Sequence, residues 1–282
     1  MAMNHADVYA VAGAKGGIGK TTTSINLASS FTEQNFDTLV IECDLAMANV
    51  VDFLKLDMVA DSDPTLHEVL SGEVDTSTAI YEAPGGFDII PSGVTLEGYV
   101  KSDPRKLHDV VEGLSESYDL ILLAVRAGLS FESVLPMKIA DKTILVSSPR
   151  VASVRDIRKT KRLAELAGSK VVGIVFVKSG TGKAPPPDRI AVFLDVNLLG
   201  HVPDDDHVPA AQDSGQPVLL KFPDSSASRA YREITAKLIS ANTIDEAATV
   251  TDSADLSDQP GNPGNGQTAI DESALEGSEN VD

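Results

Sequence analysis

VYAVAGAKGGIGKTTTSINLASSF, residues 8–31, is the stretch that decides how this chain folds. Its first five residues form a short apolar, β-branched run that is typical of a buried parallel strand, and its second half has helical composition. Between the two, the glycines Gly16, Gly17 and Gly19 let the backbone curl with its N–H groups turned inward. This order of strand, glycine loop and helix predicts a phosphate-binding loop.

The predicted loop offers positive charge to a polyphosphate in several ways. The helix N-terminus and the inward N–H groups supply partial charges, and Lys20 adds a full charge near the β and γ phosphates. The Thr21 hydroxyl is a candidate ligand of Mg²⁺. The alternative is a glycine-rich turn with two solvated lysines. That alternative does not explain why the strand, the loop and the helix occur together, so a nucleotide site is expected.

The first glycine position of the generic loop pattern holds Ala14, and Lys15 follows it. The resulting segment KGGIGKT resembles the deviant Walker A motif of the MinD/ParA family. The resemblance implies ATP and Mg²⁺ as cofactors, and an ATP-dependent homodimer in which Lys15 reaches the nucleotide of the other subunit. It also implies that the whole loop binds the nucleotide, through Ala14, Lys15, Gly16, Gly17, Ile18, Gly19, Lys20, Thr21 and Thr22.

A second segment, ECDLAMANV at residues 42–50, follows an apolar run and resembles switch I of the same family. The resemblance implies that Asp44 lies by the γ-phosphate, orients the attacking water and supports the hydrated Mg²⁺. An acid at the carboxyl end of a parallel strand is also where open α/β sheets place ligand groups. The alternative role for Asp44 is a turn or a helix cap. Lys15, Lys20 and Asp44 are thus the candidate catalytic residues, and Thr21 and Asp44 are the candidate metal ligands.

The late segment LGHVPDD, residues 199–205, resembles the part of the family that lies beside the nucleotide base. Pro203 and Asp204 are therefore candidate nucleotide contacts. Val177 and Lys178, in contrast, stand where the family usually has Asn and Arg beside the adenine. This difference leaves the base specificity open.

The largest departure from the family concerns the Walker B strand, which usually ends in an aspartate. The matching stretch LILLAVRAG, residues 120–128, has Ala124 at that position. An alanine accepts no hydrogen bond from Mg²⁺-bound water, so one anchor of the metal is missing. Asp119 does not replace it, because it lies at the opposite end of the same strand. Slow ATP hydrolysis is expected.

The order of the apolar runs predicts an α/β fold with a mostly parallel twisted sheet of seven or eight strands and helices on both faces. Residues 1–244 are expected to form this phosphate-loop domain, and residues 245–282 an acidic, disordered tail without apolar periodicity. Strands are expected at residues 8–12, 38–41, 87–90, 120–125, 143–147, 171–177 and 198–202.

Composition limits the location and the kinds of partner. The chain of 282 residues has one cysteine, no run of the roughly 18 apolar residues that a membrane span needs, and no signal sequence, so a cytoplasmic protein is expected. The tail lacks the basic amphipathic helix with which bacterial MinD proteins bind membranes. The acidic balance also disfavours DNA binding.

One basic stripe is formed by Arg155, Arg158, Lys159 and Arg162 at helical spacing. It is either a solvated helix face or a docking surface for an acidic protein partner.

Two functions follow from the resemblance. One is an ATPase that acts as an ATP-dependent dimeric switch for intracellular positioning or spatial organisation, and Lys15, Lys20, Thr21 and Asp44 favour it. The other is a nucleotide-gated binding module or adaptor with little or no hydrolysis, and Ala124 favours it. A small-molecule ligase such as dethiobiotin synthetase shares the loop, but no segment indicates a substrate site for one.

The acidic balance suggests adaptation to a salt-rich cytoplasm. The formal net charge is -19, and ten of the acids lie after Lys237, where no lysine or arginine follows. The rest of the chain therefore keeps a charge of -9 and is acidic in its own right. At about 1 M ionic strength the Debye length falls to about 3 Å, so repulsion between surface carboxylates is largely screened.

We predict that the melting temperature rises as KCl is raised from about 0.1 M to above 1 M, because salt screens this repulsion. Thermal unfolding followed by circular dichroism measures the effect. Sucrose at matched osmolality is the control for general exclusion of a cosolvent from the protein surface. Greatest stability in dilute buffer would refute the halophilic hypothesis.

Overall fold

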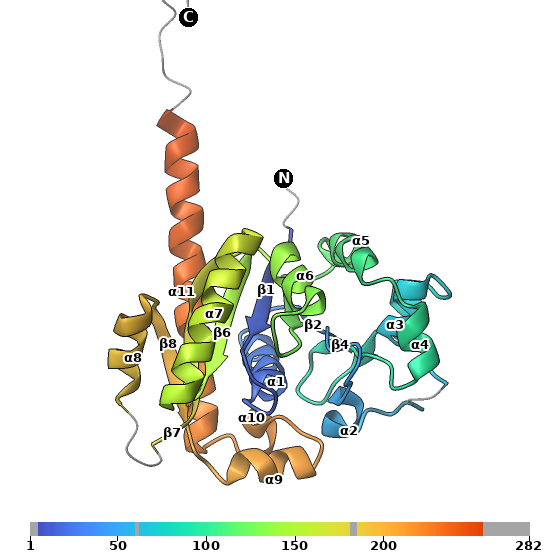
Figure 1. Cartoon of the computed structure of the whole chain (residues 1–282), viewed down its shortest axis with the longest axis horizontal. Coiled ribbons are helices and arrows are strands. Elements are labelled where there is room, and N and C mark those ends of the chain that lie inside the picture. The colour runs from blue at the N-terminus through green and yellow to red at the C-terminus, as the bar shows by residue number, and fades with distance from the viewer. Residues whose placement is uncertain (1–4, 60–61, 181–184, 256–282) are drawn as a thin grey trace, which may run out of the picture. The chain divides into compact units, whose positions relative to one another are not determined.

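A computed structural model describes residues 5–59, 62–180 and 185–255 of the chain. Its centre is one sheet of eight strands in the order β3-β4-β2-β5-β1-β6-β7-β8 (Figure 1). The strands are β1 (Asp7–Ala12), β2 (Thr38–Glu42), β3 (Tyr81–Glu82), β4 (Asp88–Ile90), β5 (Leu120–Ala124), β6 (Lys142–Ser147), β7 (Lys170–Ser179) and β8 (Leu198–Pro203). All neighbouring pairs are parallel except β3 with β4. The expected α/β fold is confirmed.

Helices cover both faces of this sheet (Figure 1). They are α1 (Lys20–Thr32), α2 (Val50–Leu54), α3 (Leu66–Ser71), α4 (Leu96–Lys101), α5 (Leu107–Leu114), α6 (Phe131–Ile139), α7 (Val151–Ala167), α8 (Pro187–Leu194), α9 (His207–Asp213), α10 (Val218–Lys221) and α11 (Ser226–Asp255). The alternation of strand and helix follows from parallel pairing, since each parallel strand needs a crossover connection.

Successive side chains of β1 point to opposite faces of the sheet, and the core therefore has two layers. Tyr9 and Val11 pack with residues of α1, α10 and the first turns of α11, whereas Val8, Ala10 and Ala12 pack with residues of α3, α5 and α6. All five side chains are buried. Burial on both faces is the reason that this strand is apolar throughout and does not alternate with polar residues.

The sheet order fixes where a ligand can bind. The chain leaves β1 through the glycine loop and crosses to β2, while β5 and β6 lie on the two sides of β1. Such a topological switch point leaves a crevice at the carboxyl ends of the strands. The ends of β2 and β5 therefore lie on one side of the glycine loop, and the ends of β7 and β8 lie on the other.

Two features of the fold differ from the sequence-based predictions. The hairpin strand β3 has no counterpart among the seven predicted strands. The predicted boundary at residues 244 and 245 falls inside α11, which continues as a helix to Asp255. The contact pattern divides the chain into Met1–Ser240 and Ala241–Asp282. The part of the predicted disordered tail from residue 256 onward lies outside the described residues.

Among the helices of the described ranges, none combines the length and the apolar character that crossing a membrane requires.

Candidate functional site

A cavity of about 940 Å³ opens at the carboxyl ends of the central strands. Its floor is the glycine loop, residues 16–22. The β2 and β5 ends line one side of it through Glu42, Asp44, Asn49 and residues 124–127, and the β7 and β8 ends line the other through Val177, Lys178 and residues 202–206. All the predicted loop residues from Gly16 to Thr22, together with Asp44, Pro203 and Asp204, thus lie around one cavity.

The backbone of the loop depends on its glycines. Gly17 and Gly19 have φ values of 69° and 105°, a region that L side chains rarely adopt. Gly19 directly precedes α1 as its N-cap, so the first turn of the helix points its N–H groups at the cavity. A Cβ at Gly13 would lie only 2.7 Å from the carbonyl oxygen of Val146, which keeps this position free of a side chain.

Lys20 is the first residue of α1, and only 9% of its surface is exposed. Its ammonium group is 3.4 Å from the carbonyl oxygen of Lys15. Burial lowers the pKa of Lys20, and the negative charge of Asp44 opposes this effect. A buried cation at a helix N-terminus makes the floor of the cavity strongly attractive to an anion.

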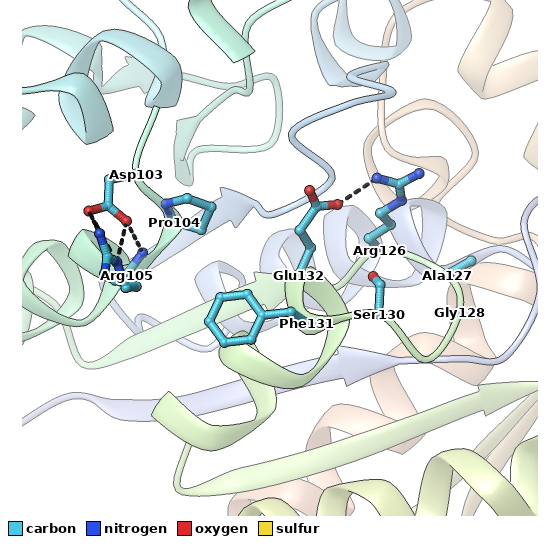
Figure 2. A pocket seen from close by; sticks show the side chains of 9 residues that line it. All are labelled: Asp103, Pro104, Arg105, Arg126, Ala127, Gly128, Ser130, Phe131 and Glu132. Atoms are coloured by element: carbon cyan, nitrogen blue, oxygen red, sulfur yellow. Dashed lines mark hydrogen bonds and ion pairs between the residues drawn. The ribbon is translucent and has the colours of Figure 1, made fainter. Parts of the chain in front are cut away.

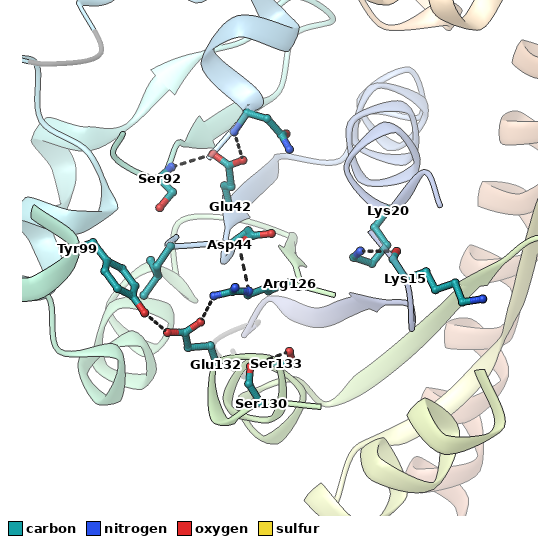
Figure 3. A network of polar contacts seen from close by, with 12 residues as sticks. Lys15, Lys20, Glu42, Asp44, Ser92, Tyr99, Arg126, Ser130, Glu132 and Ser133 are labelled. Atoms are coloured by element: carbon teal, nitrogen blue, oxygen red, sulfur yellow. Dashed lines mark hydrogen bonds and ion pairs between the residues drawn. The ribbon is translucent and has the colours of Figure 1, made fainter. Parts of the chain in front are cut away.

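Lys15 behaves differently from Lys20. Its ammonium group pairs with Asp156 of α7 at 3.1 Å, and both side chains are partly exposed. Figure 3 shows the two lysine side chains pointing in different directions from the loop. Lys15 therefore does not line the cavity of its own chain.

Asp44 lies just past the end of β2 in a network of charges (Figure 3). Its Oδ1 is 3.6 Å from Nε of Arg126, which is too long for a hydrogen bond. Among the described residues this buried oxygen has no hydrogen-bond partner. Burial raises the pKa of Asp44, while Arg126 and Lys20 oppose the rise. Asp44 lines the cavity, but its buried Oδ1 lies against Arg126, so a cation bound to this carboxylate would share it with that guanidinium.

Glu42 ends β2 and is almost completely buried. Its carboxylate accepts backbone N–H bonds from Asn49 (2.9 Å), Val50 (3.2 Å) and Ser92 (3.0 Å). Burial raises the pKa of Glu42 to about 7, although these three hydrogen bonds favour the charged form. Glu42 thus fixes the segment that carries Asp44 to the loop after β4.

Ala124 is the last residue of β5 and is buried. It pairs in register with Glu42 of β2 and with Val11 of β1. The strand end that would carry the Walker B acid therefore adjoins the cavity, but it presents only a methyl group.

On the opposite side of the cavity, an apolar wall lies next to the loop, while Lys178 and the acids at positions 204–206 line the rest. Val177 approaches Gly19, since a Cβ there would lie 3.4 Å from Cγ2 of Val177. Val202 and Pro203 continue this apolar wall, and the N–H of Asp204 donates to the carbonyl of Ser179 at 2.9 Å. Lys178 has a φ of 52°. An apolar wall of this kind suits the flat face of a base or sugar.

Arg126 and Glu132 are site residues that sequence reasoning missed. Nη1 of Arg126 donates to Glu132 of α6 at 2.5 Å, and the Tyr99 hydroxyl donates to the other oxygen of Glu132 at 2.7 Å. Arg126 also lines an adjoining hollow of about 440 Å³ with Ser130 and Phe131 (Figure 2). The signal for Arg126 was a charged residue two positions past an apolar strand that ends at the switch point.

The predicted basic stripe lies on the exposed face of α7. Arg155, Arg158, Lys159 and Arg162 are all exposed. Arg162 pairs with Glu165 at 3.3 Å. The stripe borders a shallow hollow whose apolar lining includes Leu129, Leu163, Leu166 and Phe193.

The parallel sheet, the glycine loop and the carboxylate that faces it define an α/β protein of the phosphate-loop class. The family model described as an AAA domain matches residues 6–166. An uncharacterized ATP-binding protein of Methanocaldococcus jannaschii is 36% identical over 234 residues, which are 82% of this chain and 87% of that relative. The chain therefore belongs to the MinD/ParA family of phosphate-loop ATPases.

Two solved structures match the fold closely. The cell division ATPase MinD of Pyrococcus furiosus superposes with a TM-score of 0.79 at 29% identity, over 83% of this chain and 98% of that one. The septum site-determining protein MinD of Pyrococcus horikoshii, solved with Mg-ADP, has a TM-score of 0.79 at 30% identity, over 83% of this chain and 96% of that one.

Proposed function

We propose that this chain is an ATP-dependent dimeric switch for spatial organisation inside the cell, with slow ATP hydrolysis. The observation that carries the proposal is the cavity that the glycine loop, buried Lys20 and Asp44 line together. Membership of the MinD/ParA family supports ATP as the ligand. The cell division and septum-site names of the two solved MinD relatives support a role in positioning.

In this proposal, different residues of the site contact different parts of the nucleotide. The loop N–H groups bind the phosphates, and Lys20 binds the β and γ groups with a full charge. Thr21 and Asp44 would hold Mg²⁺, since both line the cavity and carry the oxygen ligands that this ion prefers. When bound, Mg²⁺ neutralises charge that develops on the phosphates. Asp44 orients the attacking water through its carboxylate. Pro203 and Asp204 contact the nucleotide on the opposite side of the loop.

Lys15 belongs to the dimer in this proposal. In the single chain its ammonium group pairs with Asp156 and stays outside the cavity. An exposed ion pair contributes little stability, so its exchange for a phosphate of the facing subunit costs little. ATP would then close the dimer by attracting Lys15 from across the interface.

Ala124 supports a second candidate, a nucleotide-gated binding module that closes on ATP and scarcely hydrolyses it. The methyl group of Ala124 offers no oxygen to metal-bound water. Glu42, its register partner on β2, already accepts hydrogen bonds from three backbone N–H groups. In both candidates the ATP-bound form is long-lived. The exposed basic stripe on α7 is the proposed docking surface for an acidic protein partner, with a solvated helix face as its alternative.

The first prediction concerns nucleotide binding. Lys20→Ala should weaken ATP binding at least tenfold, because a hydrogen bond to a charged group is worth about 1.5 to 3 kcal/mol. Calorimetric titration with ATP and Mg²⁺ measures the loss. Lys221→Ala, which removes an exposed lysine at the end of α10, is the matched control and should bind normally. Unchanged affinity in Lys20→Ala would disprove the assignment of the loop.

The second prediction concerns the dimer. Lys15→Ala should keep ATP binding in the monomer but lose ATP-dependent dimerisation, because its charge acts in the other subunit. Light scattering with and without ATP separates the two effects. Asp156→Asn breaks the same intrachain ion pair and should still dimerise. If the unmodified protein stays monomeric with ATP, the dimer mechanism is wrong for this chain.

The third prediction concerns the rate of hydrolysis. Ala124→Asp should speed ATP hydrolysis by about 10 to 100-fold, the usual effect of an outer-shell metal partner. Ala124→Asn is the matched control, since it has the same size without the charge. The new carboxylate would lie beside buried Glu42, so the stability of both variants must be measured as well. Equal phosphate release by the two variants would favour the binding-module candidate.

A further inference from the structure

Arg126 lines the nucleotide cavity, but neither of the functions proposed above uses it. It comes two residues after the end of β5, and it lines both the cavity and the adjoining hollow. Figure 2 shows its guanidinium directed toward Glu132. About a third of the side chain is exposed, so it is neither a core residue nor a fully solvated one.

The contacts of Arg126 are with two carboxylates that share its single charge. Glu132 accepts a hydrogen bond of 2.5 Å from Nη1, whereas Asp44 lies 3.6 Å from Nε. The Tyr99 hydroxyl donates to the far oxygen of Glu132 at 2.7 Å and holds that carboxylate in place (Figure 3). The hydrogen bond to Glu132 therefore holds the guanidinium at the edge of the cavity.

The sheet order shows which part of a nucleotide lies near Arg126. Arg126 and Asp44 follow β5 and β2, on one side of the glycine loop, and the apolar wall of Val177 and Pro203 lies on the other side. A nucleotide whose phosphates bind the loop places its base against the apolar wall. Its terminal phosphate then points toward Asp44 and Arg126.

A guanidinium suits this position because its planar fork matches the oxygens of a phosphate. A terminal phosphate carries more negative charge than one carboxylate, so it competes with Glu132 for Arg126. A diphosphate ends one phosphate earlier and does not reach the fork.

We propose that Arg126 binds the γ-phosphate and distinguishes ATP from ADP, while Glu132 holds its guanidinium when that phosphate is absent. This inference rests on the proposed function, because it takes ATP as the ligand of the same cavity. Arg126, which follows β5, would thus be a third cation for the nucleotide beside the two lysines of the loop.

The test compares Kd for ADP with Kd for adenylyl-imidodiphosphate, a non-hydrolysable ATP analogue, at a fixed Mg²⁺ concentration. Arg126→Ala should raise the Kd of the analogue at least tenfold, equivalent to about 1.4 kcal/mol, and change that of ADP less than twofold. Glu132→Gln removes the competing charge and should lower the Kd of the analogue about threefold. Arg105→Ala is the matched control, since Arg105 pairs with Asp103 and does not line the cavity.

The opposite signs of the two variants separate a phosphate contact from a structural role. Equal weakening of both ligands by an Arg126→Ala variant that folds normally by circular dichroism would show a structural role and overturn the assignment. So would an unchanged Kd for the analogue in both Arg126→Ala and Glu132→Gln. If the unmodified protein binds neither ligand, the proposed function fails and the role of Arg126 fails with it. If both ligands bind and only Lys20→Ala loses them, the role of Arg126 alone fails.

Discussion

The burial of Lys20 at the start of α1 is the constraint on which the rest of the site depends. A cation that is 9% exposed and lies at a helix N-terminus is costly unless an anion is near. Asp44 supplies part of that charge, but it lies on another strand and is itself buried enough for its pKa to rise. Arg126 in turn balances Asp44, and Glu132 and Tyr99 orient Arg126. Desolvation makes the contacts of Lys20 and Asp44 necessary, whereas Arg126 itself remains about a third exposed.

The same logic explains how the site accommodates Ala124. Glu42 and position 124 are register partners, so an acid at 124 would stand beside a buried carboxylate. Two such groups cannot both be charged at low cost. Here the carboxylate of Glu42 accepts hydrogen bonds from three backbone N–H groups, and these bonds fix the segment after β2 and the loop after β4. Alanine at the end of β5 avoids this conflict, and its methyl group offers no oxygen to the cavity.

Much of this arrangement could be predicted from the sequence, because the decisive signals are local. The glycine loop and the apolar run before it predict β1, the loop and α1 with Lys20, and Asp44 was predicted from the resemblance of its segment to switch I and from its place at a strand end. The two-residue strand β3 was missed because a pattern of two half-exposed residues has no periodicity. Arg126 was missed for a different reason. Its partner Asp44 is far away in the sequence, and only the adjacency of β2 and β5 brings the two together.

The distribution of positive charge around the loop unites these observations. Lys15 pairs with Asp156 on α7, Lys20 faces Asp44, and Arg126 is bonded to Glu132 on α6. In the proposed dimer, a triphosphate would compete for Lys20 and Arg126 of its own subunit and for Lys15 of the partner subunit, in a molecule with a net charge of -19. Each cation that turned to the phosphates would leave a carboxylate on a different element without its partner. Binding would then change the charge on α6 and α7, and this change would couple the nucleotide to surfaces that a partner can contact.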